Sequence, residues 1–163
     1  MELERRIEIL EATLARQLAW IGASDAKAGF VFGVATAMLA LLASKALPYG
    51  EWTACGVVFT ALSSVLLLAS LACVVGTVFP RTKGPRVSVV YFGGITRGTV
   101  DDFRAEMQAL SDEMYEEDLV QQCHINASYA GQKYRLVKMA SALLAISVLP
   151  WLASAYLLFR DAR

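Results

Sequence analysis

The chain has 163 residues, 56% of them hydrophobic, and its 15 basic and 15 acidic residues give a net charge of zero. Soluble domains are typically about 45–50% apolar. Three long stretches, 28–44, 52–79 and 139–159, contain no charged residue at all. The remaining residues are divided among separate segments, which excludes a soluble enzyme domain of ordinary size. The balanced charge gives no indication of a nucleic-acid partner.

The first predicted element is an amphipathic helix over residues 1–27. Its apolar residues follow one another at steps of three and four, which is the spacing of one helical face. These residues are Leu3, Ile7, Leu10, Leu14, Leu18 and Ile21. No proline or turn cluster interrupts the chain before the first uncharged stretch. We therefore expect one continuous helix from Glu2 to Ala46.

Three transmembrane helices are predicted, over residues 28–47, 52–79 and 139–159. A bilayer span takes about 20 mostly apolar residues, and the second and third uncharged stretches are long enough by themselves. The first is slightly short, but Lys45 near its end can extend its amino group to the headgroups. The residues at 48–50 (PYG) are expected to form a tight external turn.

Residues 80–138 are predicted to hold a loop and further helices. Glycines and a proline in 81–99 favour a loop with at most one short strand. A short helix should follow, capped by Thr99 or Asp101 and reaching Ser111. A second long helix then starts near Ser111 and continues into the third span, where Pro150 should bend it. Its predicted buried face is Leu119, Cys123, Asn126, Ala130, Tyr134 and Val137.

Two long helices thus leave the membrane on one side, each with an apolar stripe that requires a partner. We predict an all-α membrane protein whose helices 1 and 3 extend into a cytosolic helical stalk, capped by the loop and the short helix. Eight basic residues flank the spans on the stalk side and three on the other, which places the N-terminus in the cytosol and the C-terminus outside. The eight are Arg16, Lys27, Arg81, Lys83, Arg86, Lys133, Arg135 and Lys138.

No catalytic or metal site is predicted, and no cofactor. The single histidine, His124, stands next to Cys123, and neighbouring positions on a helix point about 100° apart, which does not suit a metal pair. The acidic run at 112–118 is interpreted as a solvated helix face. The spans contain no ionisable residue in their cores, which argues against a pump or transporter.

A row of small residues runs along the first span. It consists of Gly22, Ala26, Gly29, Gly33 and Ala37. Small residues at this spacing let helices approach closely in lipid. Packing inside one protomer is the favoured interpretation, and contact between subunits is the alternative.

Charged residues of all three helices are expected at the level of the inner headgroups. Lipid phosphates are one explanation for such a basic collar. Asp25 and Asn126 do not suit that explanation, because an acid gains nothing from anionic lipid and a polar residue in an apolar stripe needs a partner. With nearby aromatic residues they could instead form a pocket for a phosphate and a base.

Several short motifs resemble, in order along the chain, those of the Pycsar transmembrane effector family. They are SDAKAG at 24–29, PR at 80–81, YFGGI at 91–95, and a final set made of Gln122, Asn126, Ala130 and KY at 133–134. The resemblance covers nearly the whole chain. It marks Asp25, Lys27, Arg81, Asn126 and Lys133 as candidate ligand-binding residues.

The resemblance implies a non-enzymatic membrane effector in bacterial antiphage defence. Its trigger would be a cyclic pyrimidine mononucleotide, cyclic UMP or cyclic CMP, and its effect damage to the inner membrane and arrest of the infected cell. A homo-oligomer in the lipid bilayer is expected. Two alternatives stay open, a constitutive membrane scaffold that docks a partner on its cytosolic helices, and a pore-forming lysis protein that needs no ligand.

Overall fold

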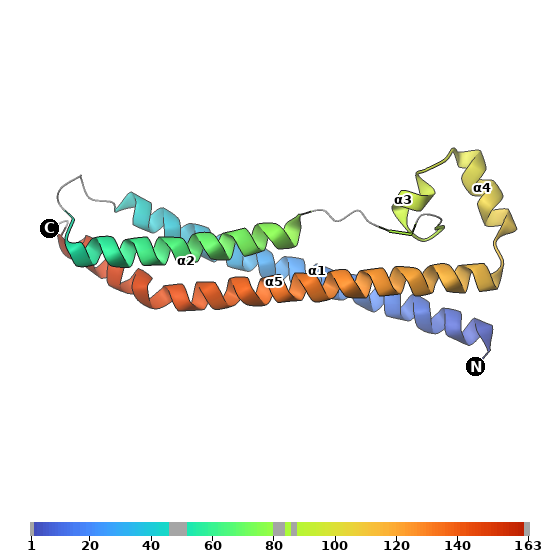
Figure 1. Ribbon diagram of the computed structural model, residues 1–163, viewed down its shortest axis with the longest axis horizontal. Helices are drawn as coiled ribbons and strands as arrows, with labels where there is room; N and C mark the ends of the chain where they lie inside the picture. The colour runs from blue at the N-terminus through green and yellow to red at the C-terminus, as the bar shows by residue number, and fades with distance from the viewer. Residues whose placement is uncertain (1, 46–51, 80–83, 86–87, 162–163) are drawn as a thin grey trace. The chain divides into compact units, whose positions relative to one another are not determined.

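A computed structural model describes residues 2–45, 52–79, 84–85 and 88–161. These residues form five helices and no strand (Figure 1). The chain divides into two compact units, each built from two segments. Unit 1 contains Met1–Ala23 and Pro80–Gln132, and unit 2 contains Ser24–Phe79 and Lys133–Arg163.

Two long helices contribute to both units. Helix α1 is Leu3–Ser44 and α5 is Asp112–Asp161, so both predicted continuous helices are confirmed. Helix α5 stays helical through Pro150, and Figure 1 shows its red, C-terminal part changing direction. A bend is expected there, since proline removes one backbone hydrogen bond and its ring crowds the preceding turn.

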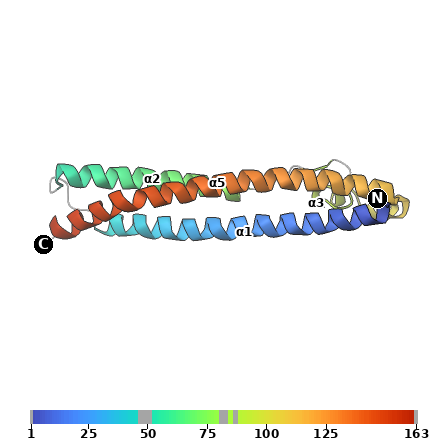
Figure 2. The ribbon, with the colours of Figure 1, turned by 90° about the horizontal axis from the view of Figure 1, so that it is seen from below.

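The remaining helix of unit 2 is α2, Ala54–Val78, which lies alongside α5 in Figures 1 and 2. Its N-terminus is capped by Thr53, whose side-chain oxygen accepts a hydrogen bond from the backbone N–H of Gly56 at 3.2 Å. The predicted turn at 48–50 lies outside the described residues.

The interior of unit 2 consists mainly of small and hydroxyl-bearing residues with a few leucines and valines among them. Their spacing of three, four or seven along each helix averages 3.5 residues per turn, as in packed, left-handed helix pairs. They include Ser24, Ala28, Val31, Ala35 and Leu42 of α1, Ser63, Leu67, Ser70, Val74 and Thr77 of α2, and Val137, Ala140, Ser147, Ser154 and Leu158 of α5. Such residues allow helix backbones to approach closely within lipid.

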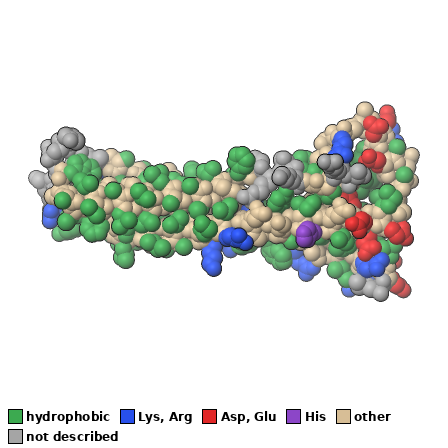
Figure 3. All heavy atoms as spheres, in the orientation of Figure 1, with side chains coloured by type: hydrophobic (Ala, Val, Ile, Leu, Met, Phe, Trp, Pro, Cys, Tyr) green, Lys and Arg blue, Asp and Glu red, His purple; other side chains and the backbone are tan. Residues whose placement is uncertain are grey.

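The outside of unit 2 is apolar. Phe30 is 71% exposed and Leu149 76% exposed, and Figure 3 shows hydrophobic side chains spread over the visible face. A water-soluble protein has the opposite distribution, with its large apolar side chains inside. Three helices, α1, α2 and α5, are long and apolar enough to cross a membrane. The chain is therefore a membrane protein with an all-α fold.

The row of small residues on the first span does not pack inside the protomer. Gly22, Gly29 and Gly33 are exposed, and no described atom outside their own helix backbone lies within 4 Å of the position that a Cβ would take. The favoured interpretation of this row is wrong. The interior face of α1 is formed instead by Ser24, Ala28 and Ala35, each of which lies two positions after a member of the row.

In unit 1, α1 and α5 run parallel and contact each other through polar groups. Arg6 forms an ion pair with Glu116 at 2.8 Å, and the Tyr115 hydroxyl donates to Glu11 at 2.8 Å. Burial, followed by this hydrogen bond, raises the pKa of Tyr115 to about 12. The N-terminal amphipathic helix thus finds its partner within the protein.

Two short helices lie between the long ones in sequence. Helix α3 is Phe92–Ile95 and α4 is Val100–Ala109. Thr99 caps α4 and forms a reciprocal capping box with Asp102, which confirms the predicted short helix and its cap. The hydrogen bond from Thr99 also lowers the pKa of Asp102.

Both predicted apolar stripes contain one wrong member. Leu18 is 56% exposed, and its neighbour Gln17 is buried in its place. Likewise Tyr134 is exposed, and the side chain of Lys133 is only 17% exposed. Buried positions recur every 3.5 residues on average along each helix. Gln17 and Lys133 fall on this spacing although they are polar, and Leu18 and Tyr134 do not.

Candidate functional site

The five predicted site residues fall in different parts of the structure. Asp25, Lys27 and Lys133 belong to unit 2, and Asn126 belongs to unit 1. Arg81 lies outside the described residues.

The three residues of unit 2 join α1 to α5. The Lys133 ammonium donates to the Asp25 carboxylate at 2.6 Å, with the Asp25 side chain 45% exposed. The Lys27 ammonium lies 5.4 Å from the centroid of the Tyr134 ring, within the range of a cation–π interaction. Asp25, Lys27, Lys133 and Tyr134 are called the charged cluster below.

Both cations of the charged cluster interact with other members of the same cluster. Asp25 compensates the charge of Lys133, and an aromatic face receives Lys27. The ion pair and the cation–π contact each join α1 to α5 within unit 2.

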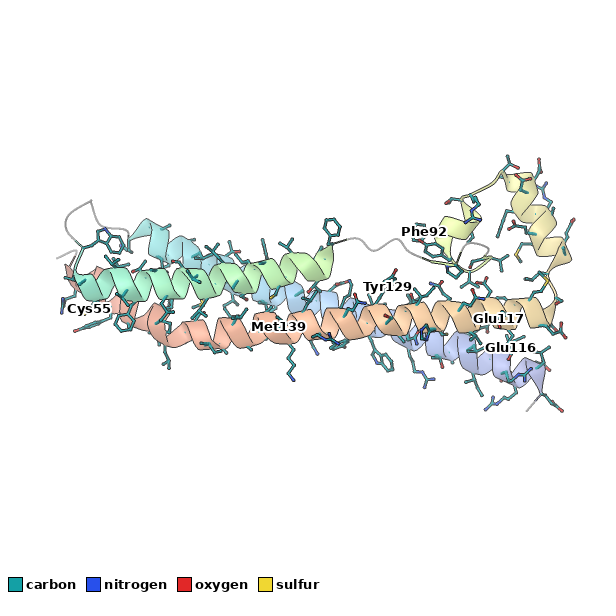
Figure 4. The ribbon with its side chains drawn as sticks, viewed as in Figure 1. Cys55, Phe92, Glu116, Glu117, Tyr129 and Met139 are labelled. Atoms are coloured by element: carbon teal, nitrogen blue, oxygen red, sulfur yellow. The ribbon has the colours of Figure 1, made fainter. Side chains whose placement is uncertain are left out.

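Unit 1 contains a cavity of about 310 Å³, near the lower limit for small-molecule sites. Figure 4 shows Phe92 of α3 and Tyr129 of α5 on facing sides of their helices. The complete lining is Leu14 and Leu18 of α1, Val90, Tyr91 and Phe92 of the turn before and at α3, and Gln122, Asn126 and Tyr129 of α5.

A buried carboxylate attaches the turn at 88–91 to α5. One oxygen of Asp118 accepts hydrogen bonds from the Ser88 hydroxyl at 2.9 Å, the Val89 N–H at 2.8 Å and the Val90 N–H at 3.2 Å. The Ser88 hydroxyl oxygen in turn accepts from the Tyr91 N–H at 2.8 Å. Hydrogen bonds to a charged acceptor are the stronger kind, so this wall of the cavity is well fixed.

Glycines allow the same turn to be this compact. A Cβ on Gly84 or Gly93 would collide with the Tyr91 ring, and a Cβ on Gly94 with the Ser88 carbonyl. The ring centroids of Tyr91 and Phe92 are 4.6 Å apart. The turn thus presents two aromatic residues in tilted contact, 56° between their ring planes, at the cavity.

Two amides of α5 supply the polar part of the lining. Gln122 is 9% exposed and Asn126 7% exposed. The Gln122 Nε2 donates to the Asn126 Oδ1 at 3.3 Å. The Gln122 Oε1 is buried and has no hydrogen-bond partner among the described residues. The predicted need of Asn126 for a polar partner in its stripe is met by Gln122.

The model of the Pycsar effector protein domain matches residues 9–160 of the chain. The chain belongs to the Pycsar effector family. The family implies a membrane effector of antiphage cyclic-nucleotide signalling. Neither a curated protein nor a solved structure matches the chain.

In this Pycsar effector, two of the motifs that led to the family contact each other. The Asp25 and Lys27 side chains come from the first motif, and Lys133 and Tyr134 from the last. The YFGGI motif forms α3 and the cavity wall beside it. Residues of these motifs therefore form one contact between α1 and α5 and part of the lining of one cavity.

Sequence reasoning missed Asp118 and Ser88 of this Pycsar effector. Asp118 was grouped with the acidic run, whose other members are exposed or half-buried, while Asp118 itself is 9% exposed. One signal was present, because Asp118 directly precedes Leu119 of the buried face and stands four residues before Gln122. Figure 3 shows several acidic side chains on the visible face near α4 and the start of α5.

Among the residues that the structure describes, no three His, Cys, Asp or Glu side chains are grouped so that they could hold a metal ion. His124 is exposed. Burial raises the pKa of the Cys123 thiol, which donates to the Leu10 carbonyl at 3.5 Å. Cys123 is a packing residue, as predicted.

Proposed function

We propose that this Pycsar effector is triggered by a cyclic pyrimidine mononucleotide, cyclic UMP or cyclic CMP, and then impairs the inner membrane so that the infected cell stops growing. Membership of the family over residues 9–160 supports the signalling role. The three apolar helices support the membrane as the target.

The proposed topology has spans at 28–47, 52–79 and 139–159. Residues 1–27 and 80–138 would lie in the cytosol and the C-terminus outside. The excess of basic residues beside 1–27 and 80–138 supports this orientation. A cytosolic position is also where an intracellular nucleotide would reach the cavity of unit 1.

The observation that carries the proposal is the continuity of α1 and α5. Both helices line the cavity in unit 1, and both continue without a break into unit 2, which holds the apolar spans. A ligand shifts a conformational equilibrium by its difference in affinity for the two states. A ligand that favours one packing of these helices in unit 1 therefore acts on the helices that cross the membrane.

We place the subunit contact of a homo-oligomer on the row of small residues. Gly29 and Gly33 face away from the interior of unit 2 and leave a smooth helix surface. Close helix contacts in lipid are commonly built on such surfaces. Packing within the protomer does not use this row, and contact with a second copy would.

The residues proposed for ligand response have distinct roles. Asn126 would contact ligand in the cavity of unit 1, and Asp25, Lys27 and Lys133 would hold the resting register of α1 and α5 in unit 2. Arg81 remains a sequence-based prediction for phosphate binding, since its guanidinium is suited to a bidentate contact.

Dye leakage from proteoliposomes tests the proposal. Purified full-length protein is titrated with cyclic UMP and cyclic CMP, and cyclic GMP serves as the control nucleotide. We expect leakage with at least one pyrimidine nucleotide and little with the control. Leakage that ignores all nucleotides would support a ligand-independent lysis protein. Absence of leakage under every condition would support a scaffold.

A further inference from the structure

The Gln122 side chain carries an unmet hydrogen-bonding capacity at the cavity of unit 1. Its Oε1 is buried without a partner among the described residues, while its Nε2 already donates to Asn126. A buried acceptor without a donor costs free energy, and native proteins rarely retain one without a reason. A ligand donor in the cavity would supply the missing bond.

The amide pair offers the same pattern whichever way its two amides are turned. With Gln122 donating to Asn126, the groups outside this bond are the Gln122 oxygen and the Asn126 NH₂. If both amides are reversed, the groups outside the bond are the Gln122 NH₂ and the Asn126 oxygen. Each arrangement leaves one acceptor and one donor side by side. The complementary ligand edge has a neighbouring donor and acceptor.

The rest of the lining suits a flat, uncharged ring. Tyr91 and Tyr129 contribute aromatic side chains, and the other lining residues are aliphatic or the aromatic Phe92. No described lining residue carries a charge, so the cavity does not match a phosphate. Aromatic faces stack on nucleobases with little regard to sequence.

We propose that this cavity binds the base of the activating nucleotide, with Gln122 and Asn126 hydrogen-bonded to the base edge and Tyr91 and Tyr129 against the ring. Uracil presents N3–H beside a carbonyl oxygen, and cytosine presents its amino group beside N3. Both edges complement the amide pair. The choice of a pyrimidine rests on the proposed function, whereas the planar donor–acceptor edge rests on the cavity itself.

A chemical probe tests the contact without altering the protein. Binding of radiolabelled cyclic UMP to the full-length protein in nanodiscs is measured in competition with N3-methyl cyclic UMP. The methyl group removes the donor and adds bulk at the same edge. We expect the methylated nucleotide to compete at least ~10-fold less well, which corresponds to one lost hydrogen bond. Equal competition would overturn the proposal.

Matched variants test the residues. Gln122→Met and Asn126→Leu keep the approximate side-chain size and remove the amide groups, and each should weaken binding by ~10-fold or more. Gln121→Met is the control, because Gln121 is exposed, lies outside the cavity lining and donates to Glu117 at 2.9 Å. Retained circular dichroism confirms folding, since apolar residues suit a buried helix face.

The outcomes separate this assignment from the proposed function. Wild-type binding that is unchanged in both cavity variants would overturn the base site while the trigger stands. Failure of the wild-type protein to bind either pyrimidine nucleotide would overturn the trigger. Loss of binding in Gln121→Met as well as in the cavity variants would also overturn the assignment, because the effect would not be specific to the cavity.

Discussion

The buried polar groups of the two units differ in how completely they are satisfied. In unit 2 the buried hydroxyls mostly bond to helix backbone or to one another. Ser70 donates to the Ala140 carbonyl of a neighbouring helix at 2.8 Å, and Ser154 pairs with Thr60 at 2.6 Å. Ser24, at the edge of the unit, is the exception among its described buried hydroxyls.

Unit 1 buries amides and a carboxylate, and part of their capacity is unused. The Gln17 Oε1, the Asp118 Oδ1 and the Gln122 Oε1 are buried without partners among the described residues. A membrane interior tolerates polar side chains that are internally paired, and unit 2 follows that rule. Unit 1 does not need to follow it if water or a ligand completes its bonds. The difference agrees with the proposal that unit 1 is the part that binds ligand.

The largest effect is expected from removing the carboxylate that attaches the turn to α5. Asp118→Ala leaves the Ser88 hydroxyl and two backbone N–H groups without their acceptor. We expect a loss of about 3 kcal/mol in the local stability of the turn. Hydrogen exchange at residues 88–95 of the full-length protein should accelerate accordingly.

Asp112→Ala is the matched control for that change. Asp112 lies in the first turn of α5 and is exposed, so its loss removes the same charge without a buried bond. Exchange at 88–95 should stay near that of the wild type. Equal acceleration in both variants would mean that charge, rather than the bonds of Asp118, holds the turn.

Two substitutions on α1 should sharpen the contrast between its inner and outer faces. Ala35 is fully buried and Gly33 faces outward. Ala35→Leu overpacks the interior and should destabilise the protomer by about 1–3 kcal/mol. Gly33→Leu should leave the protomer intact and weaken oligomers. Thermal unfolding in detergent and crosslinking in membranes distinguish the two results, and normal crosslinking of Gly33→Leu would contradict the subunit contact.

The charged cluster should show a smaller effect. A double-mutant cycle with Asp25→Asn and Lys133→Met should give a coupling free energy of about 1 kcal/mol, since the Asp25 side chain is partly exposed to solvent. The exposed pair Arg5–Glu8 provides the comparison. A coupling no larger than that of Arg5–Glu8 would remove the proposed role of the cluster in holding the helix register.

The smallest effect should concern the cap of α4. The bonds from Thr99 lower the pKa of Asp102 below its ordinary value of 3.8. Ionised Asp102 therefore supports α4 above that pH, and the support is lost as the pH falls through the folded-state value. Hydrogen exchange in α4, after correction for intrinsic rates, should show less protection at pH 3 than at pH 6. Thr99→Ala removes the hydroxyl bond to Asp102 but keeps the backbone N–H bond, so it should reduce this pH dependence, and Asp102→Asn should abolish it.

The long helices were predictable because their signals are local. Uncharged length identifies the spans, and a capping residue at Thr99 or Asp101 was predicted for the start of α4, where the structure has Thr99. The inner face of α1 was not predictable by the same means. Within a span nearly every residue is apolar, so periodicity gives no contrast, and the inner face is marked by small and hydroxyl-bearing residues instead.

Individual residues of the candidate site could be predicted from the sequence, but the contacts between them could not. Asn126 stood out as a polar residue in an apolar stripe, and its partner Gln122 lies one helical turn before it. The pairing of Lys133 with Asp25 required knowing the offset between α1 and α5, which no local pattern contains. The bonds of Asp118 depend on a turn distant in sequence, so its burial could not be separated from the exposed acids beside it.

The glycines around Tyr91 have a consequence for how this protein tolerates mutation. Gly84, Gly93 and Gly94 have no backbone angle in the range that favours glycine, so only space excludes a side chain there. Alanine at 84 or 93 would push the Tyr91 ring aside, and the ring borders the cavity. If the proposed base site is correct, such a variant should insert into the membrane but respond less to nucleotide. If the protein also assembles as proposed, these copies would act as dominant-negative subunits in mixed assemblies, and their titration would count how many responsive copies an assembly needs.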